Sequence, residues 1–357
     1  MKRTLFPIVN FILICNLFFL FSLESCKSPT SPKTNSLPDT TSNNFTFQTF
    51  TFGTSNAGSS HLQDVAVIND SDIWCVGAVY LDSADGAPDP NAYNAVHWDG
   101  SKWKLEKIQF YTFCGQQHTG SYPANAVLSL GDSVIWIASN SSQIAILSGN
   151  KQTGIVCLPV SVTKMWATND YDVYTVGAIG QIGHYQNGTW QKIESGTTLD
   201  ITDIWGSDNP SQILAVANEL GSNYLTKIIE INNNSAKLIS TYPVNYPLST
   251  VWFVPNQHYY VGGSGLYEKS QLSDSLWKNN NDISQFYTTA IRGNSINDVF
   301  TVGSYGELLH WNGVRWKSFI NETALSSGAY GAIAVKGNLI ISVGMDSGKA
   351  VILVGRR

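Results

Sequence analysis

The sequence is poor in charge and in arginine. Lys, Arg, Asp and Glu together make up 13% of the 357 residues, and the net charge is −5. After residue 25, the sequence has four arginines: Arg292, Arg315, Arg356 and Arg357. A nucleic-acid-binding domain usually carries a basic patch or stripe, and this chain has no cluster of Lys and Arg from which to build one. The composition therefore argues against nucleic acid as a partner.

Motifs for cofactor, metal and nucleophile chemistry are also missing. The sequence has no Cys-x-x-Cys spacing and no glycine-rich phosphate loop before a helical pattern. His61, His118 and His258 show no spacing typical of zinc ligands. No motif assembles a Ser-His-Asp set. We therefore expect no metal and no cofactor, and we favour a non-enzymatic protein.

The first 25 residues have the pattern of a secretory signal peptide. Lys2 and Arg3 form a positive start, residues 5–23 are largely apolar, and the small residue Ser25 ends the segment. These three features are typical of a secretion signal. The alternative is an uncleaved transmembrane anchor, because about 19 apolar residues can just cross a bilayer. We favour cleavage and export.

The segment that follows points to a lipid anchor. Leu23-Glu24-Ser25-Cys26 resembles the bacterial lipobox, which implies a lipidated cysteine, carrying diacylglycerol and palmitate, at Cys26. Residues 26–44 are rich in Ser, Thr, Pro and Asn, a composition that favours a flexible tether. Lys27, in place of Asp, is similar to lipoproteins that are sent to the outer membrane. The sequence predicts a lipid-anchored envelope protein and leaves open which side of the membrane it faces.

Residues 45–357 contain a repeat. Asp72–Gly77 (DIWCVG) recurs as Asp172–Gly177 (DVYTVG) and Asp298–Gly303 (DVFTVG), and weaker copies end at residues 138, 217, 262 and 344. The seven copies are 39–45 residues apart, apart from a first gap of 61. One apolar strand about every 40 residues is the period of four-stranded propeller blades. The sequence therefore predicts an all-β domain, a seven-bladed β-propeller with antiparallel blades.

Hairpin turns and the two ends of the domain complete this prediction. Asp-Gly or Asn-Gly pairs at 99–100, 187–188 and 312–313 lie between alternating apolar residues, which is typical of tight hairpins. The seventh repeat has only three strands, whereas residues 45–52 (FTFQTFTF) alternate like a strand that no repeat uses. We expect Phe45–Phe52 to be the outer strand of the last blade and to close the ring.

Several repeat phrases resemble those of bacterial secreted propeller proteins. They are IWGS at 204–207, NDVF at 297–300 and HWNG at 310–313, and such repeats are loosely similar to sialidase-type and photosystem-assembly-factor propellers. The resemblance implies the fold of residues 45–357 and no particular activity, since one scaffold hosts many functions. Sialidase chemistry needs an arginine cluster for the sialic-acid carboxylate, and this chain is too poor in arginine to supply one.

Two polar residues recur within the repeats. A histidine occupies the same hairpin position in the first, third and sixth repeats: His97, His184 and His310. Equivalent positions lie far apart around a ring, so we expect each histidine to pack against the aromatic residue that follows it. An aspartate opens the central strand of the same repeats: Asp72, Asp172 and Asp298. Because Asp often accepts hydrogen bonds from its own backbone, we expect these residues to cap turns.

Three cysteines follow Cys26, an odd number for an oxidising compartment. Cys75 lies in a predicted central strand and should be buried. Cys114 and Cys157 could form a disulfide, although we favour free thiols.

Long connections predict where a ligand binds. They are residues 78–94, 109–123, 240–247 and 279–287, and all belong to the two kinds of loop that emerge on one side of a propeller. Their aromatic residues, among Asn, Gln and Ser, suit a protein or glycan ligand. The tentative ligand-binding residues are Tyr80, Tyr93, Tyr111, Phe113, Tyr122, Tyr242, Tyr246, Phe286 and Tyr287.

Three functions remain open from the sequence. The favoured one is a monomeric envelope lipoprotein that binds a protein or glycan on this loop side. The second is a glycan-active hydrolase or lyase that uses Asp82, Asp85 and Asp89. The third is a surface protein without a specific ligand.

Overall fold

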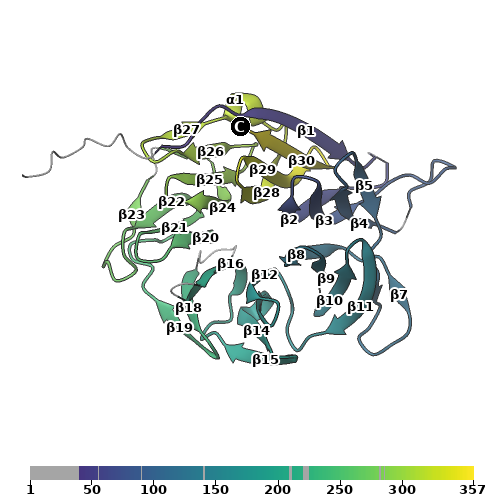
Figure 1. Cartoon of the computed structure of the whole chain (residues 1–357), viewed down its shortest axis with the longest axis horizontal. Coiled ribbons are helices and arrows are strands. Elements are labelled where there is room, and N and C mark those ends of the chain that lie inside the picture. Colours follow the sequence, from purple (N-terminus) through teal and green to yellow (C-terminus); the bar gives the residue numbers. More distant parts are fainter. Residues whose placement is uncertain are drawn as a thin grey trace, which may run out of the picture. The chain divides into compact units, whose positions relative to one another are not determined.

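The domain is a β-propeller whose blades follow one another along the chain. The computed structural model describes residues 40–54, 56–89, 91–139, 141–208, 211–219, 225–280, 283–284 and 286–357. Within them, seven four-stranded antiparallel sheets surround a central axis (Figure 1). This confirms the predicted seven-bladed fold. The predicted signal peptide, Cys26 and the tether up to residue 39 lie outside the described residues. Among the described residues, no helix has the length and hydropathy needed to cross a membrane.

Each blade has an inner strand A, two middle strands B and C, and an outer strand D. In that order, blades one to four contain β2 (His61–Asn69), β3 (Asp72–Val79), β4 (Tyr93–Trp98) and β5 (Trp103–Glu106); β8 (Ala124–Leu130), β9 (Val134–Ser139), β10 (Gln143–Ser148) and β11 (Lys151–Cys157); β12 (Lys164–Asn169), β13 (Asp172–Val176), β14 (Gln181–Gln186) and β15 (Thr189–Glu194); β16 (Asp200–Asp208), β17 (Ser211–Asn218), β18 (Thr226–Asn232) and β19 (Ser235–Ile239).

Blades five to seven contain β20 (Leu248–Val254), β21 (His258–Gly263), β22 (Gly265–Lys269) and β23 (Lys278–Asn279); β24 (Thr288–Ser295), β25 (Asp298–Gly303), β26 (Leu308–Trp311) and β27 (Trp316–Ser318); β28 (Gly328–Lys336), β29 (Leu339–Asp346), β30 (Lys349–Arg356) and β1 (Thr46–Phe52). The connections also contain β6 (Phe110–Tyr111), β7 (Thr119–Gly120), the 3-10 turn η1 (Ala178–Gly180) and the short helix α1 (Ile320–Thr323).

The hydrophobic core lies between neighbouring blades. One cluster joins Ile341 and Val343 of blade seven to Ile73 and Cys75 of blade one, and similar clusters join other neighbouring blades. Strand B is buried on both faces, so β3 is almost continuously buried, whereas the outer strand β19 is mostly exposed. This explains why strand B is the most apolar segment of each repeat, and it confirms that Cys75 is buried.

The glycine at the end of the repeat has a steric cause. At Gly177, a Cβ atom would lie 2.2 Å from the carbonyl oxygen of Ser161, and at Gly303 it would lie 2.3 Å from that of Tyr287. Both carbonyl groups belong to the segment that enters strand A of the same blade. A side chain at this position would push strands A and B apart, which accounts for the recurring Val-Gly.

The N-terminal strand closes the ring, as the sequence predicts. β1 pairs antiparallel with β30, from Thr46 opposite Arg356 to Phe52 opposite Ala350. Phe45 and Phe47 pack into the cluster between blades six and seven, and Phe50 packs into the cluster between blades seven and one. The last blade is therefore built from both ends of the domain.

The contacts of the domain with its N-terminal segment begin before β1. The amide of Thr41 donates to the carbonyl oxygen of Asn312 over 3.1 Å, and Asn43 Oδ1 lies 2.7 Å from His310 Nδ1. These residues fall in the segment that the sequence assigns to the tether. The part of that segment nearest to β1 contacts blade six.

Candidate functional site

One side of the propeller carries most of the exposed apolar side chains. The B–C and D–A connections emerge on this side, and we call it the loop face. Among the described residues, eleven large apolar side chains are exposed, and seven of them lie in these connections: Phe113, Tyr122, Ile179, Leu225, Tyr242, Tyr246 and Tyr305. Apolar groups that face water singly are ordinary, but a concentration on one face marks a candidate binding surface.

Two of these residues sit at the tips of equivalent turns in strained backbone. Ile179, in blade three, has φ 55°, and Tyr305, in blade six, has φ 59°. Ile179 is 67% exposed and Tyr305 55% exposed. A β-branched residue in the left-handed region is a rare outlier, because its Cβ crowds the following carbonyl group. Each is followed by a glycine that also has positive φ, Gly180 or Gly306.

Residues at the start of the next inner strand, or just before it, hold each of these turns in place. The amide of Ile179 donates to Asp200 Oδ1 over 2.8 Å, and the amide of Ile201 donates to the carbonyl oxygen of Gly177 over 3.0 Å. In blade six, the amide of Tyr305 donates to the carbonyl oxygen of Gly328, and the amide of Leu325 donates to the carbonyl oxygen of Tyr305. Both apolar tips are thus fixed in exposed positions. Neither tip was predicted from the sequence, although the shared pattern of Gly-Ala-Ile-Gly and Gly-Ser-Tyr-Gly is a readable signal.

A third exposed apolar group is held by a different device, the excursion between blades one and two that contains β6 and β7. Side-chain amides bind its backbone on both the N–H and C=O sides: Gln143 binds Tyr111, Gln152 binds Gln109, and Asn94 binds Ile108. The β6–β7 hairpin is too short to be stable through its own backbone hydrogen bonds, and these side-chain contacts hold it instead. Phe113, at the tip, is 65% exposed.

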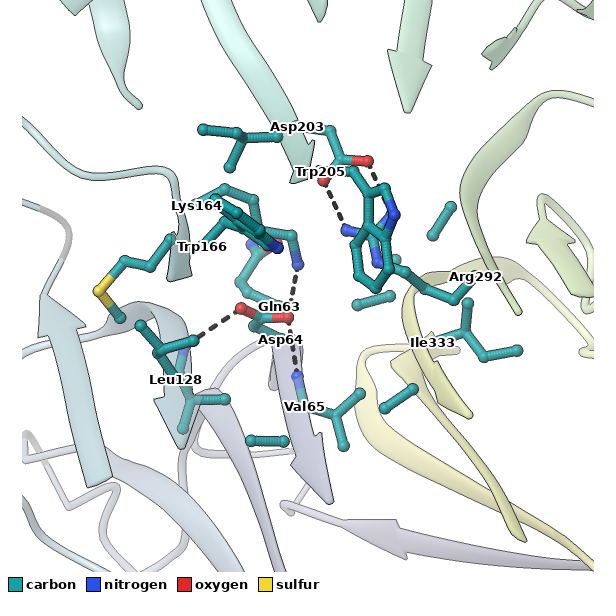
Figure 2. A pocket seen from close by; sticks show the side chains of 18 of the residues that line it. Gln63, Asp64, Val65, Leu128, Lys164, Trp166, Asp203, Trp205, Arg292 and Ile333 are labelled. Atoms are coloured by element: carbon teal, nitrogen blue, oxygen red, sulfur yellow. Dashed lines mark hydrogen bonds and ion pairs between the residues drawn. The ribbon is translucent and has the colours of Figure 1, made fainter. Parts of the chain in front are cut away.

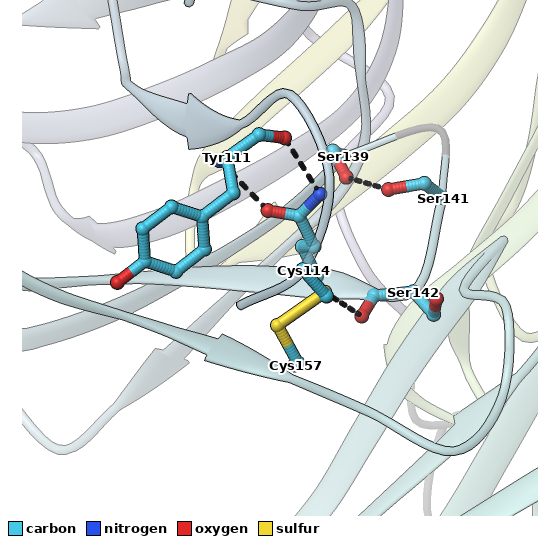
Figure 3. The surroundings of a disulfide bond; sticks show 7 residues. Tyr111, Cys114, Ser139, Ser141, Ser142 and Cys157 are labelled. Carbon is cyan, nitrogen blue, oxygen red and sulfur yellow. Dashed lines mark hydrogen bonds between the residues drawn. A yellow bond between two sulfur atoms is a disulfide. The ribbon is translucent and has the colours of Figure 1, made fainter. Parts of the chain in front are cut away.

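A disulfide completes this anchoring. Cys114 in the hairpin is bonded to Cys157 at the end of β11, with a Cα–Cα distance of 5.9 Å (Figure 3). The free thiols expected here from the sequence were wrong. The sequence separation of 43 gave no indication that the hairpin folds back across blade two.

The structure separates the nine predicted aromatic residues into two groups. Phe113, Tyr122, Tyr242 and Tyr246 are exposed on the loop face. The other five are partly buried: Tyr80, Tyr93, Tyr111, Phe286 and Tyr287. The ring of Tyr93, for example, lies 4.5 Å below the ammonium group of Lys107. The four exposed rings come from two places, between blades one and two and between blades four and five, so they do not form one cluster.

The acidic loop of blade one holds its own turns. Asp85 Oδ1 accepts a hydrogen bond from the amide of Ala87 over 3.1 Å. Asp89 accepts one from the amide of Asn91 and forms an ion pair with Lys107 at 2.9 Å. Hydrogen bonds to Asn91 and Lys107 lower the pKa of Asp89. Asp85 and Asp89 are thus engaged in the turns and the ion pair that hold this loop.

The recurring histidines and aspartates bind each other. Each histidine ring stacks on the aromatic residue opposite it in strand B, at 4.1–4.2 Å, in the pairs Trp74–His97, Tyr174–His184 and Phe300–His310. Its Nε2 atom lies 2.6–2.9 Å from an aspartate oxygen, in the pairs Asp72–His97, Asp172–His184 and Asp298–His310. The histidines do pack on aromatic rings, but the expected ring, that of the following residue, was wrong. The aspartates hold the histidines, which the turn-capping expectation missed.

A ring of six bulge residues, five of them with polar side chains, surrounds the central cavity near the loop face. Six A strands have a β-bulge close to their start, and each bulge leaves one extra residue: Gln63, Asn125, Thr202, Ser249, Thr289 and Gly331. All of them line a cavity of about 570 Å³ bounded by the inner strands of all seven blades. Several reach a carbonyl group of the next blade, as Thr202 does to Ser249 at 3.2 Å. The bulges thus link neighbouring blades around the cavity.

Four charged side chains enter the same cavity (Figure 2). Lys164 of β12 donates to Asp64 of β2. Arg292 of β24 donates from both terminal nitrogens to Asp203 of β16, over 2.9 and 2.7 Å. The ring of Trp205 covers the guanidinium group at 5.0 Å.

Each ion pair joins two blades that have one other blade between them. The carboxylate of each pair also accepts a hydrogen bond from that middle blade. Asp64 accepts from the amide of Val127, and Asp203 accepts from that of Val251, each over 3.1 Å. Each ion pair with its bridging amide therefore links three consecutive blades. The four charges are engaged with one another, so we assign the quartet a structural role.

Burial and charge act in opposite directions on Asp203. Burial by itself raises the pKa of this carboxyl group, but the charge and hydrogen bonds of Arg292 outweigh it and hold the pKa below its usual value. The ion pair is therefore formed at neutral pH. No role was predicted for Arg292 from the sequence, although an arginine in an apolar inner strand is a visible signal.

The loop face is acidic. The described B–C and D–A connections contain five carboxylates that are at least partly exposed, Asp82, Asp85, Asp89, Glu219 and Glu322, and a buried one, Glu307. They contain one cationic side chain, Lys107, which is paired with Asp89. A basic partner would therefore be attracted to this face and an acidic one repelled.

Comparison with known proteins gives the fold and no family. The sequence matches no protein-family model and no curated protein. Among solved structures, YCF48 bound to a D1 peptide has a TM-score of 0.63 at 14% identity, covering 90% of this chain and 99% of that one. YCF48 from Cyanidioschyzon merolae has a TM-score of 0.60 at 12% identity, covering 86% and 98%. The WD40 β-propeller domain of Doa1 has a TM-score of 0.59 at 14% identity, covering 86% and 96%.

Proposed function

We propose that this protein is a non-enzymatic envelope lipoprotein, anchored through Cys26, that binds a protein partner on its loop face. The observation that carries the proposal is the pair of exposed apolar tips, Ile179 and Tyr305, held in left-handed backbone. Strained backbone of this kind costs about 1–3 kcal/mol and is concentrated at functional sites. A solvent-exposed turn with no ligand gains nothing from an apolar residue in that conformation.

The chemistry of the loop face favours a basic and partly apolar protein segment. The exposed tips are fixed before binding, so a partner would lose little free energy in ordering them. Asp85, Glu219 and Glu322 are exposed on the same face and would attract Lys or Arg side chains. One similar propeller has been solved with a peptide bound. A neutral glycan is the alternative occupant, and the experiment below separates the two.

Site-specific crosslinking tests the proposal. A photoreactive amino acid at position 179 or 305 of the full chain, in its own cell envelope, should form an adduct with one defined protein. Position 171 is the matched control, because Tyr171 is also 67% exposed but lies on the opposite side of the propeller. Adducts of equal yield from 171 and 179 would contradict the proposal. So would binding to a neutral oligosaccharide array together with the absence of any protein adduct.

Ile179→Asn tests whether the strained turn serves binding and not folding. Asn tolerates the left-handed region better than a β-branched residue, so we expect the free energy of unfolding to rise by about 1 kcal/mol. The yield of the protein adduct from position 305 should fall in the same variant. Chemical denaturation measures the first effect, and Ile179→Val, which keeps both the strain and the apolar surface, is the control. A loss of stability in Ile179→Asn would show that the side chain supports the fold.

A further inference from the structure

The seven outer strands of the propeller differ in one respect. Six of them carry a lysine: Lys104 in β5, Lys151 in β11, Lys192 in β15, Lys237 in β19, Lys278 in β23 and Lys317 in β27. The seventh, β1, has the sequence TFQTFTF and no charged residue. Lysines on edge strands prevent one sheet from pairing with another. The other blades therefore show what a protected edge looks like in this protein, and β1 lacks that protection.

The free edge of β1 is long and accessible. The strand pairs with β30 along one edge through all seven residues, and no strand within the described residues pairs with the other edge. Figure 1 shows β1 on the outer rim of the ring. Thr46, Gln48, Thr49 and Thr51 are exposed. At a rise of about 3.4 Å per residue, the edge offers roughly 24 Å of unpaired backbone groups.

An aromatic groove runs beside this edge. It has a volume of about 470 Å³ and lies between β1 and the hairpin that joins β4 to β5. Its lining includes Gln48, Phe50, Trp98, Trp103 and one charged residue, Lys102 of the hairpin. The indole nitrogen of Trp103 is buried there without a hydrogen-bond partner in the described chain. A strand added to β1 would lie along this groove and bring an acceptor near the indole group.

We propose that β1 pairs antiparallel with β1 of a second copy of this chain, about a two-fold axis at Thr49. In this register, Thr49 faces Thr49 of the other copy, Phe47 faces Thr51, Gln48 faces Phe50, and Thr46 faces Phe52. Thr–Thr and aromatic–β-branched pairs are favourable across antiparallel strands, and neither of the two paired strands carries a charge. The two last blades then form one continuous sheet.

A second copy of β1 fits the free edge of β1, because the strand is complementary to itself. A partner strand must be uncharged, because β1 offers no charge to pair with, and it should alternate β-branched and aromatic residues. The second copy presents this strand on an identical free edge. Two copies on one membrane surface would also be concentrated by their anchors. From the sequence we expected a monomer, and the proposed pairing would make the protein a dimer.

Cysteine crosslinking of the full chain in membranes tests the pairing and its direction. Thr49→Cys should give about ten-fold more covalent dimer than Thr189→Cys, an exposed position of β15, because only opposed residues meet disulfide geometry. Thr51→Cys should also crosslink poorly, since Thr51 faces Phe47. Equal dimer from Thr49→Cys and Thr51→Cys would indicate parallel stacking and overturn the proposal, as would no dimer from either.

A charged variant gives an independent measurement. Thr49→Lys restores the lysine that the other outer strands carry, and it should shift sedimentation of the detergent-solubilised full chain from dimer to monomer. Gln191→Lys, in β15, is the matched control and should leave the dimer unchanged. Thermal unfolding checks that both variants fold. A wild-type chain that sediments as a monomer over roughly a hundred-fold range of concentration would overturn the proposal.

Discussion

Deletion of residues 45–52 abolishes the cooperative unfolding transition of the propeller. Without β1, the seven-residue ladder to β30 is lost, and Phe45, Phe47, Phe50 and Phe52 leave the clusters on both sides of blade seven. Removal of one large buried aromatic group costs about 3–5 kcal/mol, and a whole domain is stable by only about 5–15 kcal/mol. Loss of four partly buried rings and a ladder together exceeds that margin. Calorimetry of the purified variant measures the result.

Two further variants separate the loss of β1 from the effects of a shortened chain. Deletion of residues 30–37 removes the same number of residues upstream of the described domain and should leave the transition in place. Phe47→Ala retains the backbone of β1 and should lower the free energy of unfolding by about 2 kcal/mol, because the ring is only partly buried. If the deletion of 45–52 melts like the wild type, β1 does not close the ring.

Arg292→Met lowers the free energy of unfolding by about 3–5 kcal/mol. The variant leaves the carboxylate of Asp203 buried in the central cavity without its counter-charge, and breaking a buried pair from one side is costly. Adding Asp203→Leu should recover most of the loss, because the uncompensated charge is then gone. Urea denaturation at neutral pH measures all three proteins.

An exposed ion pair and the pH dependence of unfolding serve as controls for the effect of the buried Arg292–Asp203 pair. Lys192→Met breaks the exposed pair with Glu194 and should cost less than about 1 kcal/mol. Because Arg292 holds the pKa of Asp203 below its unfolded value, the stabilisation is present above about pH 4 and is lost as the pH falls through the lowered pKa. The free energy of unfolding should therefore fall less steeply at acid pH in the variant that carries both Arg292→Met and Asp203→Leu than in the wild type. Equal losses for Arg292→Met and Lys192→Met would show that the central pair is not effectively buried.

The repeat was readable in the sequence because local rules produce it. Strand B is buried on both faces and must be apolar, its final glycine must fit against strand A, and Asn-Gly or Asp-Gly must turn the hairpin. The closing strand was visible for the same reason, since FTFQTFTF alternates as an outer strand does. Each of these features depends on contacts within one blade or with the next.

The long-range contacts of the domain were less predictable, because the residues that make them are distant in the sequence. Arg292 and Asp203 are 89 residues apart, and their meeting depends on how seven blades bring their inner strands around one axis. Cys114 and Cys157 meet because a hairpin folds across blade two. Five of the nine predicted aromatic residues turned out to be partly buried, because composition alone cannot tell a ring that supports a loop from one that faces solvent.

By itself, the sequence determined that this chain forms a seven-bladed propeller whose N-terminal strand completes its last blade. Only the tertiary structure decided which side chains of the loop face are exposed, that Ile179 and Tyr305 are held in left-handed turns, and that β1 alone lacks a protecting lysine at its free edge. The physical reason is the range of the interactions. Hydrophobic alternation and turn chemistry act over a few residues and can be read along the chain, whereas exposure and edge pairing depend on where distant blades lie in space.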